Sequence, residues 1–94
     1  MTERDNKACA VWFVYIVQCQ DKSLYTGVCT DVERRVDEHN NDDKKAARYT
    51  RARRPVALRY QESRLNRSDA CKREAVIKKL TRNQKLSLIA SAPA

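Results

Sequence analysis

The sequence holds little of several residue types: one glycine, one histidine and two prolines among 94 residues. One histidine and four cysteines without C-x-x-C spacing argue against a structural zinc site, which needs four closely spaced ligands. The only long apolar run, residues 11–17, is too short for a membrane span or a secretory signal. No internal repeat or low-complexity tract is present. We therefore expect a cytoplasmic protein with reduced thiols and no membrane association.

Charge is abundant and unevenly distributed. The formal net charge is +8. Residues 1–43 contain 5 lysines and arginines against 9 acidic residues, whereas residues 44–94 contain 15 against 3. A surface this basic attracts polyanions, so nucleic acid is the expected partner; a merely solvated basic face is the alternative.

A chain of this length forms one domain, because it cannot supply two hydrophobic cores. We predict a flexible N-terminal arm over residues 1–10, a single domain over residues 11–90 and a C-terminal tail over residues 91–94.

The first half of the domain has the pattern of a β-hairpin. Residues 11–19 are rich in β-branched and aromatic side chains and predict a central strand, and residues 20–23 predict a turn. Residues 24–29 predict a second strand antiparallel to the first. Gly27 within that strand indicates a bulge or the close approach of another group. The sequence does not fix the register, but a three-residue loop would place Tyr15 and Tyr25 on one face.

A helix is predicted to begin in residues 30–33, where Thr30 and Glu33 have capping-box spacing, and to end at residues 40–41. Arg35 and His39 are four residues apart in this helix, so they lie on one face and can reach a common point.

The second half alternates loops with a strand and two helices. A basic loop is predicted over residues 42–55, with at most one helical turn, followed by a strand over residues 56–61. After a loop over residues 62–67, Ser68 is the expected N-cap of a helix and Thr81 that of a last, short helix.

Glu74 is predicted at the edge of the apolar stripe of the penultimate helix, between Ala70 and Ile77. A carboxylate there costs free energy unless a positive group pairs with it. Arg35 or a divalent metal would serve; an ion pair with a neighbouring lysine or arginine is the simpler alternative.

Five side chains together supply the groups that metal-assisted phosphodiester cleavage needs, although each alone is ordinary. They are two phenols, a guanidinium, an imidazole and a lone carboxylate: Tyr15, Tyr25, Arg35, His39 and Glu74.

In these residues and their spacing the chain resembles the GIY-YIG nuclease superfamily, and its short stand-alone YhbQ-like branch in particular. Val14-Tyr15-Ile16 stands where the first motif is expected, and Tyr25-Thr26-Gly27 where the second is. Further similarity lies in residues 31–40, 49–56 and 73–85, so the resemblance covers about residues 11 to 90. Valine replaces the first glycine of the motifs and threonine the middle isoleucine, but both tyrosines remain.

The resemblance implies an α/β (α+β) fold, with a small three-stranded antiparallel sheet flanked by helices in the order β-β-α-β-α-α. It also implies DNA cleavage with one divalent ion, Mg²⁺ or Mn²⁺, and carries Tyr15, Tyr25, Arg35, His39 and Glu74 into the catalytic site.

Within that site Glu74 is the expected metal ligand and Arg35 the contact to the scissile phosphate. Tyr25 is the candidate for taking a proton from water, directly or through His39, and Tyr15 for orienting the water or the phosphate. Asn83 is the nearest match to an asparagine that completes the site in some relatives, but its distance from Glu74 along the chain leaves it outside the predicted set.

The basic loop is expected to grip the nucleic-acid backbone without reading sequence. Its contact residues are predicted to be Lys44, Lys45, Arg48, Tyr49, Arg51, Arg53 and Arg54. Tyr49 has two alternatives, stacking on an unpaired base or a role in the core.

Three interpretations follow. The first is an endonuclease acting on single-stranded, duplex or branched DNA, with RNA as another substrate, in repair, recombination or defence. The second is a non-catalytic DNA- or RNA-binding module that uses residues 44–54. The third is a structural subunit of a larger complex. The joint presence of the five site residues favours the enzyme.

Overall fold

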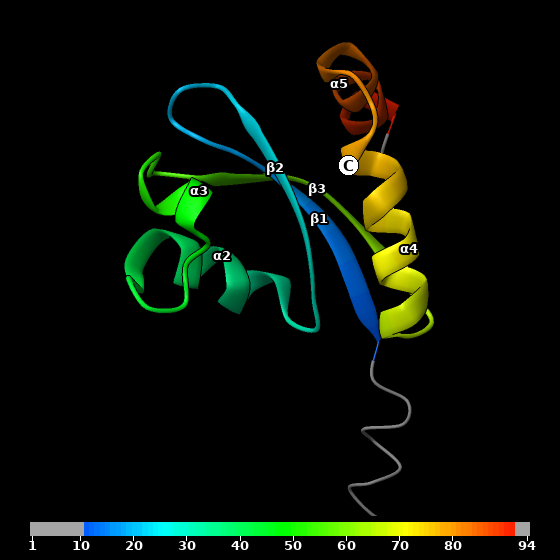
Figure 1. The fold of residues 1–94 in the computed structure, drawn as a ribbon, viewed down its shortest axis with the longest axis horizontal. Coiled ribbons are helices and arrows are strands. Elements are labelled where there is room, and N and C mark those ends of the chain that lie inside the picture. Colours follow the sequence, from blue (N-terminus) through cyan, green and yellow to red (C-terminus); the bar gives the residue numbers. More distant parts are fainter. Residues whose placement is uncertain (1–10, 92–94) are drawn as a thin grey trace, which may run out of the picture.

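A computed structural model describes residues 11–91 and places a three-stranded antiparallel sheet at the centre of the domain (Figure 1). Strands β1 (Trp12–Gln18) and β2 (Leu24–Cys29) form a hairpin, and β3 (Ala57–Arg64) pairs with the other side of β1. The spatial order is therefore β2-β1-β3, with the first strand in the middle.

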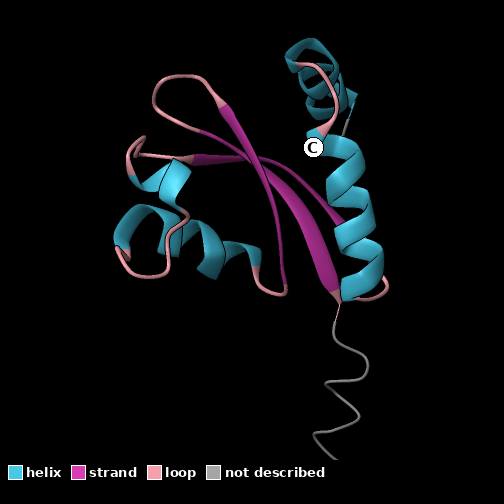
Figure 2. Ribbon diagram, in the orientation of Figure 1, coloured by secondary structure: helices cyan, strands magenta, loops and turns pink. Residues whose placement is uncertain are grey.

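Four helices complete the described part of the chain (Figure 2). Helix α2 (Val32–Asn41) and the single turn α3 (Arg48–Arg51) lie between β2 and β3 in sequence, and α4 (Arg67–Lys78) and α5 (Arg82–Ser91) follow β3. The predicted α+β class is confirmed, and α3 is the helical turn expected within the basic loop.

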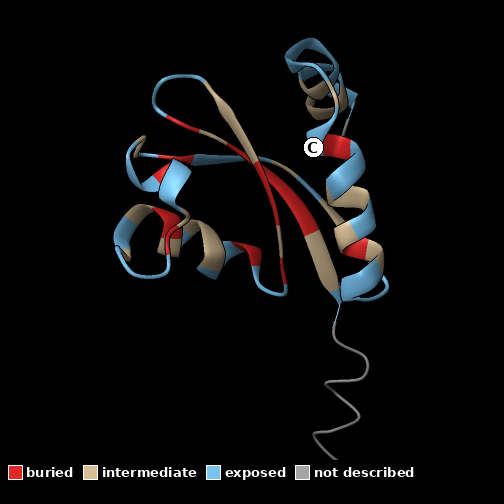
Figure 3. Ribbon diagram, in the orientation of Figure 1, coloured by how far each residue is buried: buried red, intermediate tan, exposed pale blue. Residues whose placement is uncertain are grey.

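The helices cover opposite faces of the sheet because alternate residues of a strand point in opposite directions. Tyr15 and Val17 of β1 pack with α2, whereas Val14 and Ile16 pack with α4. Figure 1 shows α2 and α3 on one side of the sheet and α4 on the other, and Figure 3 shows the buried residues concentrated along β1 between them. The domain thus has two thin cores that share one strand.

The hairpin register puts both tyrosines on the α2 face. Tyr15 is opposite Gly27 and Val17 is opposite Tyr25, so Tyr15 and Tyr25 are diagonal neighbours. The loop between the strands, residues 19–23, has five residues rather than three. Any loop with an odd number of residues places Tyr15 and Tyr25 on the same face of the hairpin.

Strand β3 is longer than its sequence pattern predicts. It continues to Arg64, where a loop over residues 62–67 was expected, and a register shift opposite Ile16 and Val17 leaves Arg59 as an extra residue. Glu62 and Arg64 point towards α4, where Arg73 Nε lies 3.0 Å from Glu62 and Arg64 Nε lies 3.0 Å from Asp69. These ion pairs explain why charged residues are tolerated in the strand.

Two predicted helix caps are wrong by one or two residues. Asp31, not Thr30, caps α2 by accepting a hydrogen bond from the Arg34 amide at 3.1 Å. Asn66, not Ser68, caps α4 by accepting from the Asp69 amide. In each case several capping residues are adjacent in sequence, and the one that caps is set by where the strand before it ends.

The third predicted cap is present, since the Thr81 hydroxyl accepts a hydrogen bond from the Gln84 amide at 3.1 Å. Within residues 11–91, no helix is both long and apolar enough to cross a membrane. The predicted arm, residues 1–10, and the tail after Ser91 lie outside the described residues.

Candidate active site

A hydrogen bond between Tyr15 and His39 forms the centre of the α2 face. The Tyr15 hydroxyl lies 2.8 Å from His39 Nε2, joining the middle strand to the last turn of α2. Tyr15 is 1% exposed and His39 is fully buried. Arg35, one helical turn before His39, also lies near the Tyr15 hydroxyl, where its charge acts to lower the pKa of that group.

Thr50, in the short helix α3, holds the other ring nitrogen of His39. Its Oγ1 lies 2.8 Å from His39 Nδ1 and donates to the Ala47 carbonyl at 3.0 Å. Thr50 is fully buried. The sequence did not single it out as a site residue, because a threonine among arginines carries no pattern of its own and only the fold brings it to His39.

Both central groups are neutral at physiological pH. Burial, assisted by the nearby Arg35 charge, lowers the pKa of His39 to about 4. Burial also raises the pKa of the Tyr15 hydroxyl, and the nearby Arg35 guanidinium offsets only part of that effect. The pair is therefore a hydrogen bond between neutral groups rather than an ion pair.

Arg35 is anchored by two hydrogen bonds. Its Nη1 donates to the Lys45 carbonyl at 2.7 Å and to Glu38 Oε1 at 3.0 Å. Burial acts to lower the pKa of Arg35, but Glu38 and Tyr15 outweigh it and raise that pKa. Glu38 is a second residue that the sequence did not single out, although its spacing of three from Arg35 was a usable signal.

Tyr25 differs from Tyr15 because it is only partly buried. Its ring meets the His39 ring edge-on, with centroids 5.5 Å apart, and stacks on Tyr49 at 5.9 Å. The Arg53 guanidinium lies 3.9 Å from the centroid of Tyr49. Tyr25 is thus the tyrosine of the pair that reaches the surface, and Tyr49 already stacks within the protein.

The basic segment, residues 44–54, divides into two groups. Arg51 and Arg54 bond to Asp43, Arg54 also donates to the His39 carbonyl at 2.7 Å, and Arg53 pairs with Asp21. The remaining basic residues of the segment are exposed and have no ion pair with the residues that the structure describes: Lys44, Lys45 and Arg48. Half of the basic residues predicted to contact nucleic acid therefore also stabilise the fold.

Glu74 is apart from this cluster. It lies on α4, which packs on the opposite face of the sheet and also contacts β2, the strand that carries Tyr25. Its carboxylate pairs with Lys78 at 3.4 Å, and its side chain is 21% exposed. Arg35 pairs with Glu38 instead, so the neighbouring lysine, the simpler of the two predicted partners, is the one observed.

Residues 11–91 contain no group of three or more histidine, cysteine, aspartate or glutamate side chains placed to hold a metal. Mg²⁺ commonly binds through one or two carboxylates, with water and substrate phosphate completing its shell. The half-buried Glu74 carboxylate fits that requirement as a single protein ligand.

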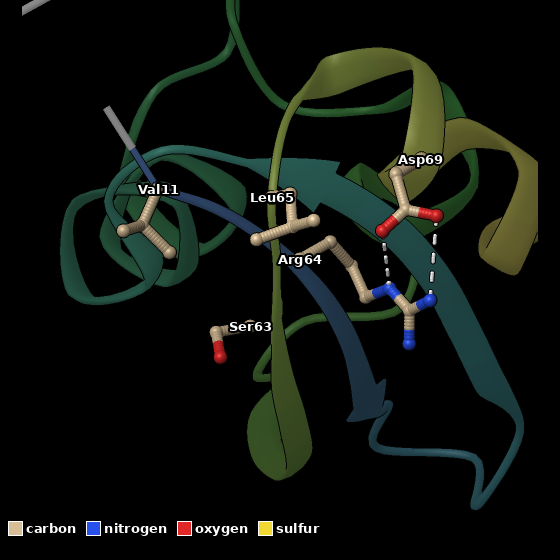
Figure 4. A pocket seen from close by; sticks show the side chains of 5 residues that line it. All are labelled: Val11, Ser63, Arg64, Leu65 and Asp69. Atoms are coloured by element: carbon tan, nitrogen blue, oxygen red, sulfur yellow. Dashed lines mark hydrogen bonds and ion pairs between the residues drawn. The ribbon is translucent and has the colours of Figure 1, made fainter. Parts of the chain in front are cut away.

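A pocket on the α4 side is lined by Val11, Ser63, Arg64, Leu65 and Asp69. Figure 4 shows that the Arg64 guanidinium is engaged with Asp69 at this pocket, and Leu65 is 85% exposed. None of the five predicted catalytic residues lines it, so it is separate from the candidate site.

The chain also matches a known protein family. The model of the GIY-YIG catalytic domain matches residues 11–87, and on that match the chain belongs to the GIY-YIG family. This span includes the hairpin, α2, α3, β3, α4 and part of α5.

Similar proteins carry the family designation UPF0213. One from Desulfotalea psychrophila is 55% identical over 78 residues, which are 83% of this chain and 70% of that protein. One from Staphylococcus epidermidis is 57% identical over 77 residues, 82% of this chain and 92% of that protein.

Solved structures of similar proteins support the fold. The solution NMR structure of a UPF0213 protein from Bacillus halodurans has a TM-score of 0.54 and 38% identity, covering 85% of this chain and 83% of that one. A solution NMR structure from E. faecalis has a TM-score of 0.55 and 40% identity, covering 83% and 82%.

Proposed function

We propose that this protein is a metal-dependent endonuclease that hydrolyses phosphodiester bonds in DNA. Membership of the GIY-YIG family supports a nuclease. The observation that carries the proposal is the joining of Tyr15, Arg35 and His39 on one sheet face, with Tyr25 at its surface edge. Exposed basic side chains of residues 44–48 follow directly on α2, which carries Arg35 and His39.

The proposed roles follow from exposure. Tyr25 is partly exposed, so its hydroxyl is placed to contact water at the phosphate and to take its proton. Arg35 is half-buried and rigidly held, so its planar fork is the proposed contact to the scissile phosphate.

His39 and Tyr15 have a different role from the one expected of them. Neither reaches solvent, and both His39 ring nitrogens have protein partners. Tyr15 is therefore not placed to orient a water, and no hydrogen bond joins His39 to Tyr25 among the described residues. We assign Tyr15 and His39 to positioning the residues that touch the substrate.

Glu74 is the residue that would hold a divalent cation, Mg²⁺ or Mn²⁺. Such a cation would offset the negative charge that develops on phosphate oxygens during cleavage. The carboxylate would exchange its present Lys78 partner for the metal, a small cost because that pair is exposed on the lysine side.

The substrate backbone is proposed to lie along Lys44, Lys45 and Arg48, whose charges are free of ion pairs with described residues. Base stacking on Tyr49 would require its contacts with Tyr25 and Arg53 to open. We also propose a cytoplasmic location, supported by the buried free thiols of Cys19 and Cys29.

Cleavage of labelled DNA tests the proposal. Single-stranded, duplex and branched substrates, with a matched RNA, are incubated with Mg²⁺ or Mn²⁺ and the wild type or Glu74→Gln. We expect metal-dependent cutting that the substitution abolishes, while Glu33→Gln, an exposed acidic control on α2, retains it.

Circular dichroism first establishes that both variants are folded. Tight binding with no cutting by any form would replace the nuclease by the non-catalytic binding module that uses residues 44–54.

A further inference from the structure

The described hydrogen bonds determine which nitrogen of His39 carries the proton. Tyr15 is 1% exposed, and among residues 11–91 the only acceptor for its hydroxyl proton is His39 Nε2 at 2.8 Å. The Arg35 guanidinium lies near the Tyr15 oxygen, and its positive charge acts to lower the pKa of that hydroxyl. If Nε2 carried a proton, the phenol proton would be buried without an acceptor, which costs on the order of 1–3 kcal/mol.

The other side of the ring gives the same answer. Thr50 has one hydroxyl proton, and it donates that proton to the Ala47 carbonyl at 3.0 Å. The 2.8 Å contact between Thr50 Oγ1 and His39 Nδ1 is therefore satisfied when Nδ1 is the donor. The Ala47 amide donates towards Nδ1 at 3.4 Å, a contact that would favour the other tautomer, but it is long and therefore weaker than the 2.8 Å contact with Thr50.

We propose that Thr50 is a positioning residue that fixes His39 as its Nδ1–H tautomer, so that Nε2 accepts the Tyr15 proton and the Tyr15 oxygen is free to accept from Arg35. The chain runs from the Ala47 carbonyl through Thr50, His39 and Tyr15 to Arg35. The direction of donation along these hydrogen bonds is set at Thr50. In sequence, Thr50 lies 15 positions after Arg35, whose guanidinium the hydrogen bonds orient.

The structural part of this inference stands without any enzymatic activity, whereas the catalytic part rests on the proposed function. Removing the Thr50 hydroxyl leaves the buried Nδ1–H without its acceptor. The ring would then favour the Nε2–H tautomer, which donates to Tyr15 and competes with Arg35 for the same oxygen. The Tyr15 oxygen would then be less able to accept from the nearby Arg35 guanidinium.

Nitrogen-15 NMR of the imidazole is a direct test, because the chain has one histidine and its ring signals need no assignment. At pH 7 the wild type should show a protonated Nδ1 and an unprotonated Nε2. A protonated Nε2 in the wild type would overturn the proposal, and this result depends on no variant.

Two substitutions at position 50 separate the hydroxyl from the shape of the side chain. Thr50→Val keeps the shape and removes the hydroxyl, and Thr50→Ser keeps the hydroxyl. We expect the Nε2–H form to rise in Thr50→Val and the wild-type tautomer to persist in Thr50→Ser. An unchanged tautomer in a folded Thr50→Val would overturn the role of Thr50. If Thr50→Val does not fold, Tyr15→Phe serves instead: with the phenol donor gone, Thr50 alone should keep the Nδ1–H form, and a change to Nε2–H would overturn its role.

The kinetic consequence is measured with the DNA substrate that the wild type cuts. Thr50→Val should lower kcat by roughly tenfold to 100-fold, as when an outer partner that orients a catalytic group is lost, with little change in KM. Thr50→Ser should restore kcat. A wild-type kcat in Thr50→Val would overturn the catalytic part. If no substrate is cut, the proposed function fails, and the NMR result still decides the tautomer.

Discussion

The Tyr15 hydroxyl occupies the space above Gly27 that any other residue would need for its side chain. A Cβ at position 27 would lie 2.5 Å from Tyr15 Oη and 2.7 Å from its Cζ. The single glycine of the chain is thus required by a close approach, as its position within a strand indicated.

Gly27→Ala should therefore destabilise the protein by about 1–3 kcal/mol, because both the strand pair and the Tyr15–His39 bond resist movement. Urea denaturation measures the free energy of unfolding. The same substitution in a Tyr15→Phe background should cost less, since the closest atom is then absent. Equal costs in the two backgrounds would show that the hydroxyl is not the group that excludes a side chain.

Stability should depend on pH through His39. Its pKa is lowered by burial from 6.5 to about 4, with Arg35 and Arg54 adding to the decrease and Glu38 opposing it. The unfolded chain therefore binds more protons between pH 4 and 6.5, and the stability present above pH 6.5 is lost as the pH falls through that window. We expect a loss of about 2 kcal/mol between pH 7 and pH 5.

Denaturation of the wild type and of His39→Gln at the two pH values gives the measurement. The variant has no histidine, so its stability should change little over this interval. A wild-type stability that is flat from pH 7 to pH 5 would mean that His39 titrates normally and is not as enclosed as the fold indicates.

Asn40 should contribute to stability far more than its neighbour Asn41. The Asn40 amide makes two bonds to the backbone of Val56, accepting from its amide at 2.7 Å and donating to its carbonyl at 3.0 Å. Asn41 is exposed and bonds to Asp37. Asn40→Ala should cost on the order of 1–3 kcal/mol in chemical denaturation, and Asn41→Ala under about 0.5 kcal/mol. Similar losses in both variants would contradict this assignment.

The exposed basic residues should determine the salt dependence of DNA binding. Changing Lys44, Lys45 and Arg48 together to glutamine should reduce the slope of log affinity against log salt concentration by about 2–3, if each contacts one phosphate. A triple variant with the same charge loss at Lys72 in α4, Lys79 at its C-cap and Lys85 in α5 is the control. An equal decrease in both would indicate general attraction to a positive protein rather than a defined contact surface.

Arg54→Gln should behave differently from those three substitutions. Its guanidinium is half-buried and bonds to the His39 carbonyl and to Asp43, so its loss should lower the free energy of unfolding by about 1–3 kcal/mol. Thermal melting compares it with Arg48→Gln, which should be close to the wild type. Unchanged melting in Arg54→Gln would mean that Arg54 does not stabilise the fold and keeps only its predicted role as a DNA contact.

Local patterns were sufficient to predict much of the fold. The apolar run of β1, the short strand β2 and the four-residue spacing of Arg35 and His39 are encoded in neighbouring residues, and the structure agrees with them. The end of β3 was missed because Glu62 and Arg64 are charged. Their partners Arg73 and Asp69 lie further along the chain, in α4, so the ion pairs are not visible in the local pattern.

For the candidate site, the sequence could predict only which residue types take part, not how they contact one another. Nothing in the sequence indicates that Thr50 reaches His39, because that contact depends on how α3 packs on α2. The Arg35–Glu38 pair, by contrast, is local to α2, and its spacing of three residues was a signal that the prediction did not use. Residues 11–19 were predicted as the central strand, but the sequence did not show that Tyr15 is buried while Tyr25 reaches the surface, because that depends on how α2 and α3 cover the hairpin.

The middle position of β1 also has a consequence for incomplete chains. A fragment that ends before Ala57 can form the β1–β2 hairpin, but it leaves the other side of β1 without its β3 partner. The most apolar strand of the described chain would then expose a row of unpaired amides and carbonyls, the arrangement that recruits strands from other molecules. Nascent or truncated copies that lack β3 should therefore aggregate more readily than copies that contain it.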